Sequence, residues 1–311
     1  MSTGEGGFSR RATLKLLAAG GLLAAGGVNS ARGESTPLLK RAIPRSGELL
    51  PAVGLGTYRT FDVGTSREER APLTEVLELF VQAGGTVVDT SPMYGRSEGV
   101  VGDLAAELGI TKSLFLATKV WTTGHDAGIR QMEESFHLLR TERIDLMQVH
   151  NLLGLSTHLR TLHEWKASRK IRYFGITHYH EDAYRELERL LRSEDFDFLQ
   201  INYSVRERKA EQTILPLAAE RGVAVIVNRP FAQGNLLARV RDKPLPPWAA
   251  DFDCTSWSQF FLKYILANRA VTCVVPATAN PEHLVENMAA GTGPLPDEAT
   301  RRRMVQLVES L

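Results

Sequence analysis

The sequence predicts an α/β protein, a (β/α)8 TIM barrel with a short N-terminal hairpin. Short apolar runs alternate with amphipathic helical patterns from residue 53 almost to the end of the chain, as expected for a barrel of parallel strands. No Gly-x-Gly-x-x-Gly sequence follows any of these runs, which argues against an open sheet with a Rossmann nucleotide site. The chain has 311 residues, 43% of them hydrophobic, and this suffices for one large core.

The predicted elements follow one another in a regular order. A hairpin is expected in residues 40–50, where Ser46-Gly47 is a turn signal. The candidate strands are residues 53–56, 86–89, 114–118, 146–149, 173–177, 198–201, 224–227 and 273–275. Helical spacing of apolar residues is clear in residues 73–83, 129–139 and 182–191. The longest interruption, residues 234–256, is either a loop over the active face or a plain surface excursion.

Charge and cysteine content exclude several classes of protein. The formal net charge is +1, which argues against nucleic acid or an acidic membrane surface as a partner. The two cysteines, Cys254 and Cys273, have neither the number for a disulfide framework nor the spacing of a metal site. Cys273 lies in an apolar run and is expected to be a small core residue, with a single disulfide to Cys254 as the alternative.

The first 33 residues resemble a twin-arginine export signal. Arg10 and Arg11 precede an apolar stretch of Leu, Ala and Gly at residues 16–28, and small residues follow at 30–33. The apolar stretch is too short and too rich in glycine for a stable membrane span. We therefore expect a signal peptide at 1–33 and a barrel domain at 40–311, with the twin-arginine machinery as a partner and a periplasmic or secreted location. An ordinary amphipathic helix at the N-terminus is the alternative.

Four polar residues stand at or just after the ends of three predicted strands. Asp89 and Tyr94 follow one apolar run, and Lys119 and His150 follow the next two. Successive strand ends of a parallel barrel meet at one face, so these side chains are expected to converge. Each residue alone has a purely structural interpretation, such as a helix cap or a core histidine. Together they predict a site that donates a proton.

Four short motifs resemble the aldo-keto reductase superfamily in their order and spacing. They are Gly-Leu-Gly-Thr-Tyr at 54–58, Val-Asp-Thr-Ser-Pro-Met-Tyr-Gly at 88–95, Thr-Lys-Val at 118–120 and Asp-Leu-Met-Gln-Val-His at 145–150. The similarity extends over about residues 40–290. It implies a (β/α)8 barrel that binds a nicotinamide cofactor without a Rossmann fold. It also implies reduction of aldehydes or ketones, or the reverse oxidation.

The resemblance assigns a role to each of the four polar residues. Tyr94 would donate the proton, although a free phenol has a pKa of about 10. A cationic Lys119 beside it would lower that pKa, and Asp89 would hold Lys119 in place. His150 would bind and orient the carbonyl oxygen of the substrate.

The resemblance also implies cofactor contacts, several of which depart from the family pattern. Gln200 matches the amide that holds the nicotinamide carboxamide, while Thr177 and His178 replace the usual Ser-Asn pair. Asn228 replaces the stacking aromatic, for which Phe231 is either a substitute ring or a core or loop residue. The remaining implied contacts are Gly56, Thr57, Arg229, which would meet the pyrophosphate, Pro230, Thr278, and Glu286 and Asn287 near the adenine.

The adenosine end of the predicted site lacks the usual basic residues. Ala277 and His283 stand in their places, so a 2′-phosphate would lose a fixed cation. We expect NADP, with NAD as a possible alternative cofactor. The expected function is reduction of a small carbonyl substrate. Two alternatives remain: a nicotinamide-binding sensor or regulatory module with little turnover, and a cofactor-independent barrel enzyme such as an isomerase or lyase.

Overall fold

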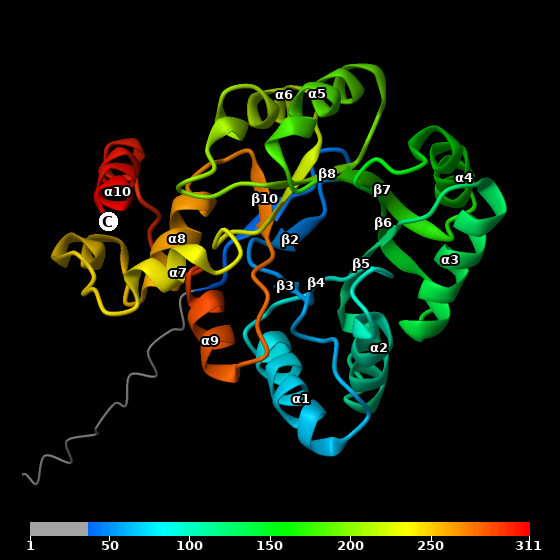
Figure 1. Ribbon diagram of the computed structural model, residues 1–311, viewed down its shortest axis with the longest axis horizontal. Helices are drawn as coiled ribbons and strands as arrows, with labels where there is room; N and C mark the ends of the chain where they lie inside the picture. The colour runs from blue at the N-terminus through cyan, green and yellow to red at the C-terminus, as the bar shows by residue number, and fades with distance from the viewer. Residues whose placement is uncertain (1–36) are drawn as a thin grey trace, which may run out of the picture. The chain divides into compact units, whose positions relative to one another are not determined.

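An eight-stranded parallel barrel forms the centre of the computed structural model, which describes residues 37–311 (Figure 1). The strands pair in chain order from β3 to β10, and isolated parallel bridges Val53–Val274 and Gly56–Ala277 join the first strand region to the last. The barrel strands are β3 (Leu55–Gly56), β4 (Val87–Asp89), β5 (Phe115–Val120), β6 (Ile144–His150), β7 (Ile171–Thr177), β8 (Phe198–Asn202), β9 (Ala224–Asn228) and β10 (Val271–Val274). The predicted fold class is therefore confirmed.

The predicted hairpin covers the amino-terminal end of the barrel. It consists of β1 (Lys40–Ala42) and β2 (Leu49–Pro51), which pair antiparallel. Ile43 and Leu50 are buried in one cluster with the apolar residues that begin the barrel strands. Burial of this apolar surface closes the end of the barrel opposite the predicted site.

Strand alternation places an apolar layer inside the barrel directly below a polar one. Phe115, Tyr173 and Phe198 pack against one another in the lower layer, with ring centroids 5.5 to 6.0 Å apart. Residues two positions further along a strand point to the same side. Gln200 therefore points inward from β8 above Phe198, and the same alternation brings the polar ends of β4, β5 and β6 into one layer.

Ten α-helices are present in residues 37–311, and those that follow β4 to β10 connect or cover the strands (Figure 1). They are α1 (Arg67–Gln82), α2 (Ser97–Glu107), α3 (His125–Leu138), α4 (Leu155–Ala167), α5 (Tyr184–Ser193), α6 (Ile214–Glu220), α7 (Asn235–Val240), α8 (Trp257–Leu266), α9 (Pro281–Ala289) and α10 (Glu298–Ser310). The predicted helix at 73–83 begins earlier, at Arg67. Ser66 caps this helix by accepting a hydrogen bond from the backbone N–H of Glu69.

The segment 234–256 is not simply a loop, and this part of the prediction was wrong. It contains α7 and a 3₁₀ segment, Pro247–Phe252. Trp248 and Phe252 pack against Phe260 of α8, with ring centroids 5.6 and 6.2 Å from it. Aromatic burial therefore gives this proline-rich stretch a fixed structure that its turn residues did not indicate.

Three further features concern predictions about partners and processing. Cys254 and Cys273 are both buried free thiols. No helix within residues 37–311 is both long and apolar enough to cross a bilayer. The predicted signal peptide at residues 1–33 lies outside the described residues.

Candidate active site

The four polar residues predicted to converge do lie together at the carboxyl-terminal ends of the strands. Asp89 ends β4, Lys119 lies near the end of β5, and His150 ends β6. The ring of Tyr94, in the loop after β4, has its centroid 5.0 Å from Lys119 Nζ and 6.0 Å from the centroid of the His150 ring. The edge of one ring meets the face of the other at 84°.

Lys119 and Asp89 form a buried ion pair beneath Tyr94. Lys119 is fully buried, and its ammonium group donates to both Asp89 carboxylate oxygens at 2.9 Å. The same group donates to the carbonyl oxygen of Thr90 at 2.7 Å. An ammonium group has three protons, so these three acceptors satisfy it completely. Lys119 is thus held by Asp89, and it faces the ring of Tyr94.

The loop that carries Tyr94 is anchored immediately after the tyrosine. Gly95 has a φ of +62°, and a Cβ atom there would lie 2.4 Å from the Asp62 carboxylate. That carboxylate accepts the backbone N–H of Arg96 at 3.0 Å. A residue with a side chain would be strained at this φ and would displace Asp62, so glycine fixes the position of the loop.

The pKa of Tyr94 is raised, whereas the sequence analysis expected Lys119 to lower it. Burial raises the pKa of Tyr94 well above its usual value, and the Asp89 carboxylate raises this pKa further. Asp89 offsets the charge of Lys119, whose own pKa is lowered by burial. Tyr94 is therefore a protonated phenol at neutral pH, which is the form that a proton donor requires.

His150 is held in its neutral form. Burial and the nearby charges of Lys119 and His178 lower its pKa to about 3. Its Nδ1 atom lies 3.1 Å from the hydroxyl oxygen of Ser91. At neutral pH the ring can offer a hydrogen bond but carries no charge.

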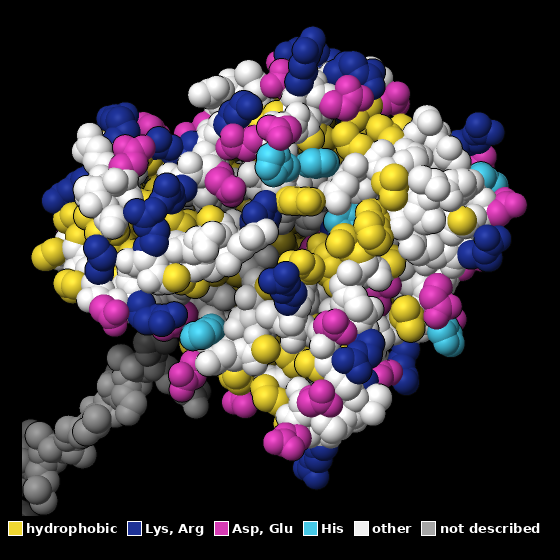
Figure 2. All heavy atoms as spheres, viewed as in Figure 1, with side chains coloured by type: hydrophobic (Ala, Val, Ile, Leu, Met, Phe, Trp, Pro, Cys, Tyr) yellow, Lys and Arg dark blue, Asp and Glu magenta, His cyan; other side chains and the backbone are white. Residues whose placement is uncertain are grey.

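Aromatic side chains that sequence reasoning missed surround the mouth of the site. The Tyr58 ring lies 5.0 Å from that of Tyr94, and the Trp121 ring lies 6.4 Å from that of His150. Tyr58 and Trp121 remain 44% and 42% exposed, which is unusual for large apolar residues. Figure 2 shows hydrophobic and histidine side chains adjoining near the middle of this face. Tyr58 and Trp121 follow the ends of β3 and β5, and this position in the sequence could have indicated that they lie at the site.

The predicted carboxamide contacts form a chain that ends on the ion pair. Thr177 Oγ1 donates to Gln200 Oε1 at 2.8 Å, and Gln200 Nε2 donates to Asp89 Oδ1 at 2.8 Å. The Thr57 hydroxyl is fully buried and donates to the backbone carbonyl of Asp89 at 3.0 Å. Gly56 packs so closely that a Cβ atom would lie 2.8 Å from the carbonyl oxygen of Val275. These residues, Thr177, Gln200, Thr57 and Gly56, thus position Asp89 or the strand ends around it.

The end of β9 offers two unpartnered polar atoms. Asn228 Nδ2 donates to the carbonyl of His178 at 3.2 Å, and Arg229 Nη1 donates to that of Tyr179 at 2.8 Å. Asn228 Oδ1 and Arg229 Nε are buried without a hydrogen-bond partner in residues 37–311. Buried polar atoms are normally satisfied, so this acceptor and donor fit a polar ligand such as a nicotinamide nucleotide. Pro230 is buried.

Phe231 packs against the hydrophobic core. This packing supports its interpretation as a core residue. The Arg229 guanidinium carbon lies 5.3 Å from the centroid of the exposed Tyr179 ring, which is the aromatic group next to this strand end.

The predicted adenosine segment forms the start of α9. Asn280 caps this helix, its side-chain oxygen accepting the backbone N–H groups of Glu282 at 2.8 Å and His283 at 3.4 Å. Asn280 also donates its own N–H to Thr278 Oγ1 at 3.0 Å. Glu286 accepts a hydrogen bond from Ser258 at 2.9 Å, and Asn287 is buried. His283 is exposed at this helix terminus, where anions bind favourably.

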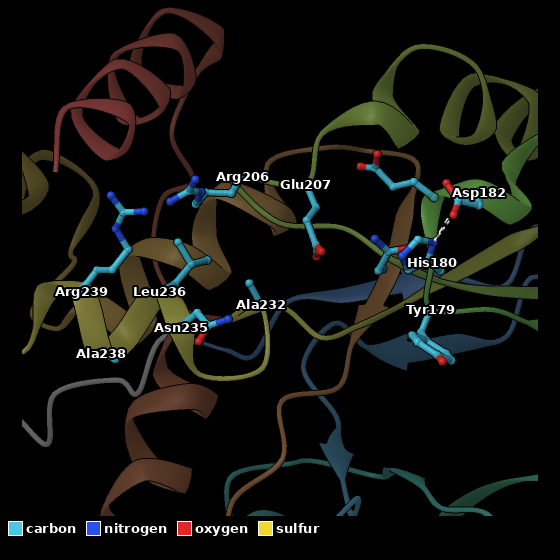
Figure 3. A pocket seen from close by; sticks show the side chains of 12 residues that line it. Tyr179, His180, Asp182, Arg206, Glu207, Ala232, Asn235, Leu236, Ala238 and Arg239 are labelled. Atoms are coloured by element: carbon cyan, nitrogen blue, oxygen red, sulfur yellow. Dashed lines mark hydrogen bonds and ion pairs between the residues drawn. The ribbon is translucent and has the colours of Figure 1, made fainter.

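A cleft of about 870 Å³ lies beside the carboxyl-terminal end of β8 (Figure 3). It is lined by residues 179–182 after β7, by residues that end or follow β8, and by α7. Arg206 and Arg239 project from two of these elements in Figure 3, and both were missed in the sequence. None of the four convergent polar residues lines the cleft. The cleft therefore lies beside the strand ends that carry polar residues, but Tyr94 does not line it.

Comparison with known proteins gives a consistent family relationship. The model of the Aldo/keto reductase family matches residues 52–303. Methylglyoxal reductase YeaE from Escherichia coli K12 is 27% identical over 258 residues, 80% of this chain and 89% of the relative. Glyoxal reductase from Bacillus subtilis is 24% identical over 247 residues, 78% of this chain and 83% of the relative.

A solved structure shares the barrel fold. An aldo-keto reductase from Klebsiella pneumoniae in complex with NADPH aligns with a TM-score of 0.73 at 24% identity. The alignment covers 87% of this chain and 96% of that one, so the likeness extends over the whole barrel.

Proposed function

The chain belongs to the aldo/keto reductase family, and we propose that it reduces a small aldehyde or ketone with NADP(H), using Tyr94 as the proton donor. The observation that carries this proposal is the convergence of Tyr94, the Lys119–Asp89 pair and His150 at the strand ends. A module that only binds nucleotide has no need of a buried ion pair under a protonated tyrosine. Reductive turnover therefore accounts better for the site than sensing does.

The side chains have separate tasks in this reaction. The nicotinamide supplies a hydride to the carbonyl carbon when it is bound. Tyr94 gives its phenolic proton to the carbonyl oxygen, and neutral His150 orients that oxygen by a hydrogen bond. Lys119 faces the Tyr94 ring and stabilises the negative charge that develops on the phenol. Asp89 keeps Lys119 charged and in place.

Asn228 and Arg229 are the residues that we propose hold the nicotinamide nucleotide. Asn228 Oδ1 can accept from an amide N–H, and Arg229 Nε can donate to a phosphate oxygen. The exposed His283 at the start of α9 would meet a 2′-phosphate. NADP(H) is therefore the proposed cofactor, and NADH should serve less well.

The substrate is proposed to be a small carbonyl compound such as a 2-oxoaldehyde. Methylglyoxal and glyoxal appear in the names of the relatives described above. Tyr58 and Trp121 provide planar apolar walls next to Tyr94 and His150. Consumption of NADPH with methylglyoxal, glyoxal and a panel of aromatic aldehydes tests the proposal. Absence of steady-state turnover with every one of them would favour a binding module.

The pH dependence of reduction is expected to be flat from about pH 5 to about pH 9. The pKa of Tyr94 is raised, so the donor loses its proton only above about pH 10. His150 has a pKa of about 3, so it gains a charge only in strong acid. The pKa of His178, whose charge would act on His150, is also lowered by burial. Steady-state kcat should be measured across this range. A break near pH 6.5 that disappears in His150→Gln would contradict the assignment of a neutral His150.

We propose that the protein is exported to the periplasm by the twin-arginine route. Arg10, Arg11 and the apolar stretch after them support this proposal. This route transports folded proteins, so the cofactor would be loaded before export. Mass spectrometry of protein purified from the periplasm should find retained NADP. The variant Arg10→Lys/Arg11→Lys should leave the protein in the cytoplasm. Equal periplasmic yield from both forms would rule out this signal.

A further inference from the structure

Ser91 is a buried serine whose hydroxyl oxygen lies 3.1 Å from Nδ1 of His150. It stands two residues after Asp89, on the segment that leads from β4 to Tyr94. The family roles described above leave it without a function. Its place beside the histidine makes the direction of this hydrogen bond chemically important.

The direction follows from counting donors and acceptors. The backbone N–H of Met93 donates to Ser91 Oγ at 3.3 Å, and an amide N–H can only donate. The Ser91 hydroxyl therefore still has its own proton to place. Within residues 37–311, His150 Nδ1 is the acceptor within hydrogen-bond reach of that hydroxyl. Neutral imidazole has one N–H, so if Nδ1 accepts the hydrogen bond from Ser91, Nδ1 is unprotonated and the ring proton is on Nε2.

We propose that Ser91 is a positioning residue that holds His150 in the tautomer protonated at Nε2, so that the ring donates to the substrate carbonyl oxygen. Nε2 makes no hydrogen bond to any residue from 37 to 311 and is thus free for a ligand. The other tautomer would present a lone pair to that oxygen and repel the negative charge developing on it. This proposal rests on the proposed function for its consequence in catalysis, but the tautomer can be observed independently.

The first test is spectroscopic and uses the full chain without added nucleotide. Long-range ¹H–¹⁵N correlation of protein labelled in its eight histidines distinguishes a protonated ring nitrogen from an unprotonated one. The His150→Gln variant identifies the His150 signals by their loss. We expect Nε2 to be protonated and Nδ1 unprotonated in the wild type. A wild-type spectrum with the proton on Nδ1 would overturn the proposal, whatever the activity.

The second test is kinetic and uses Ser91→Ala with two comparison variants. Loss of one hydrogen bond corresponds to about a tenfold effect, so kcat for reduction should fall about tenfold while the Kd for NADPH stays within about twofold. Ser91→Thr keeps the hydroxyl and should restore most of the rate. Ser193→Ala removes a hydroxyl that donates to the Leu190 carbonyl within its own helix, α5, and its rate should be unchanged.

The outcomes separate this proposal from the proposed function. In Ser91→Ala the His150 signals should shift toward a mixture of tautomers. Unchanged His150 signals and an unchanged kcat in that variant would show that Ser91 is only a turn residue. If the wild type has the expected tautomer but reduces no carbonyl compound, the proposed function fails and the role of Ser91 in fixing the tautomer stands.

Discussion

Replacing Tyr94 by phenylalanine should abolish steady-state reduction while leaving the cofactor bound. General acid catalysis typically contributes about 10²- to 10⁴-fold, so we expect kcat to fall about 10³-fold. The Kd for NADPH, measured by fluorescence titration, should change by less than about twofold. The reason is that the phenol is proposed to donate to the substrate, while the polar atoms that fit a nucleotide belong to Asn228 and Arg229 at the end of β9.

A matched control removes the same hydroxyl type from the opposite end of the barrel. Tyr173 donates to Glu48 at 2.6 Å, and its oxygen lies 2.8 Å from the hydroxyl of Ser46, which can donate to it, in the amino-terminal hairpin region. Tyr173→Phe should lower stability slightly, by about 1 kcal/mol for hydrogen bonds of this kind, and leave kcat unchanged. Wild-type turnover in Tyr94→Phe would instead remove Tyr94 from the mechanism. An equal loss of turnover in both variants would point to a general effect on folding.

The convergence of the site could be predicted from sequence because it depends on topology alone. Asp89, Lys119 and His150 follow apolar runs, and parallel strands bring such ends to one face whatever the side chains contact. The hairpin at the other end was predictable for a similar reason, since a turn signal separates two short runs. These predictions needed no knowledge of distances.

Other properties of the same residues depend on distances and burial that a sequence does not contain. The direction of the Tyr94 pKa shift depends on how deeply the ring is buried and on how close it lies to the Asp89 carboxylate. Thr177 and Gln200 bond to each other because neighbouring strands place them in register. The fixed structure of residues 234–256 comes from the packing of Trp248 on Phe260. This is a tertiary contact, which local turn propensity does not predict.

The buried ion pair gives the second large effect, which concerns stability. Lys119 is fully buried and Asp89 is 4% exposed, so removing one charge leaves the other uncompensated. Asp89→Asn and Lys119→Met should each lower the free energy of unfolding by about 3 to 5 kcal/mol. Urea denaturation followed by circular dichroism measures this, and both variants should also lose reductase activity.

The double variant Asp89→Asn/Lys119→Met separates a charge effect from a packing effect. The double variant removes both charges of the pair, and the buried Glu98 carboxyl, whose pKa burial already raises, can take up a proton when Lys119 is absent, so stability should recover to within about 2 kcal/mol of the wild type. Activity should stay lost, because nothing then stabilises the charge on Tyr94. An exposed pair serves as the control: Glu186→Gln, which removes the negative charge paired with Arg189, should change stability by less than about 1 kcal/mol. If the double variant is as unstable as the sum of the single ones, the ion pair is a packing element and its charges do not dominate its energetics.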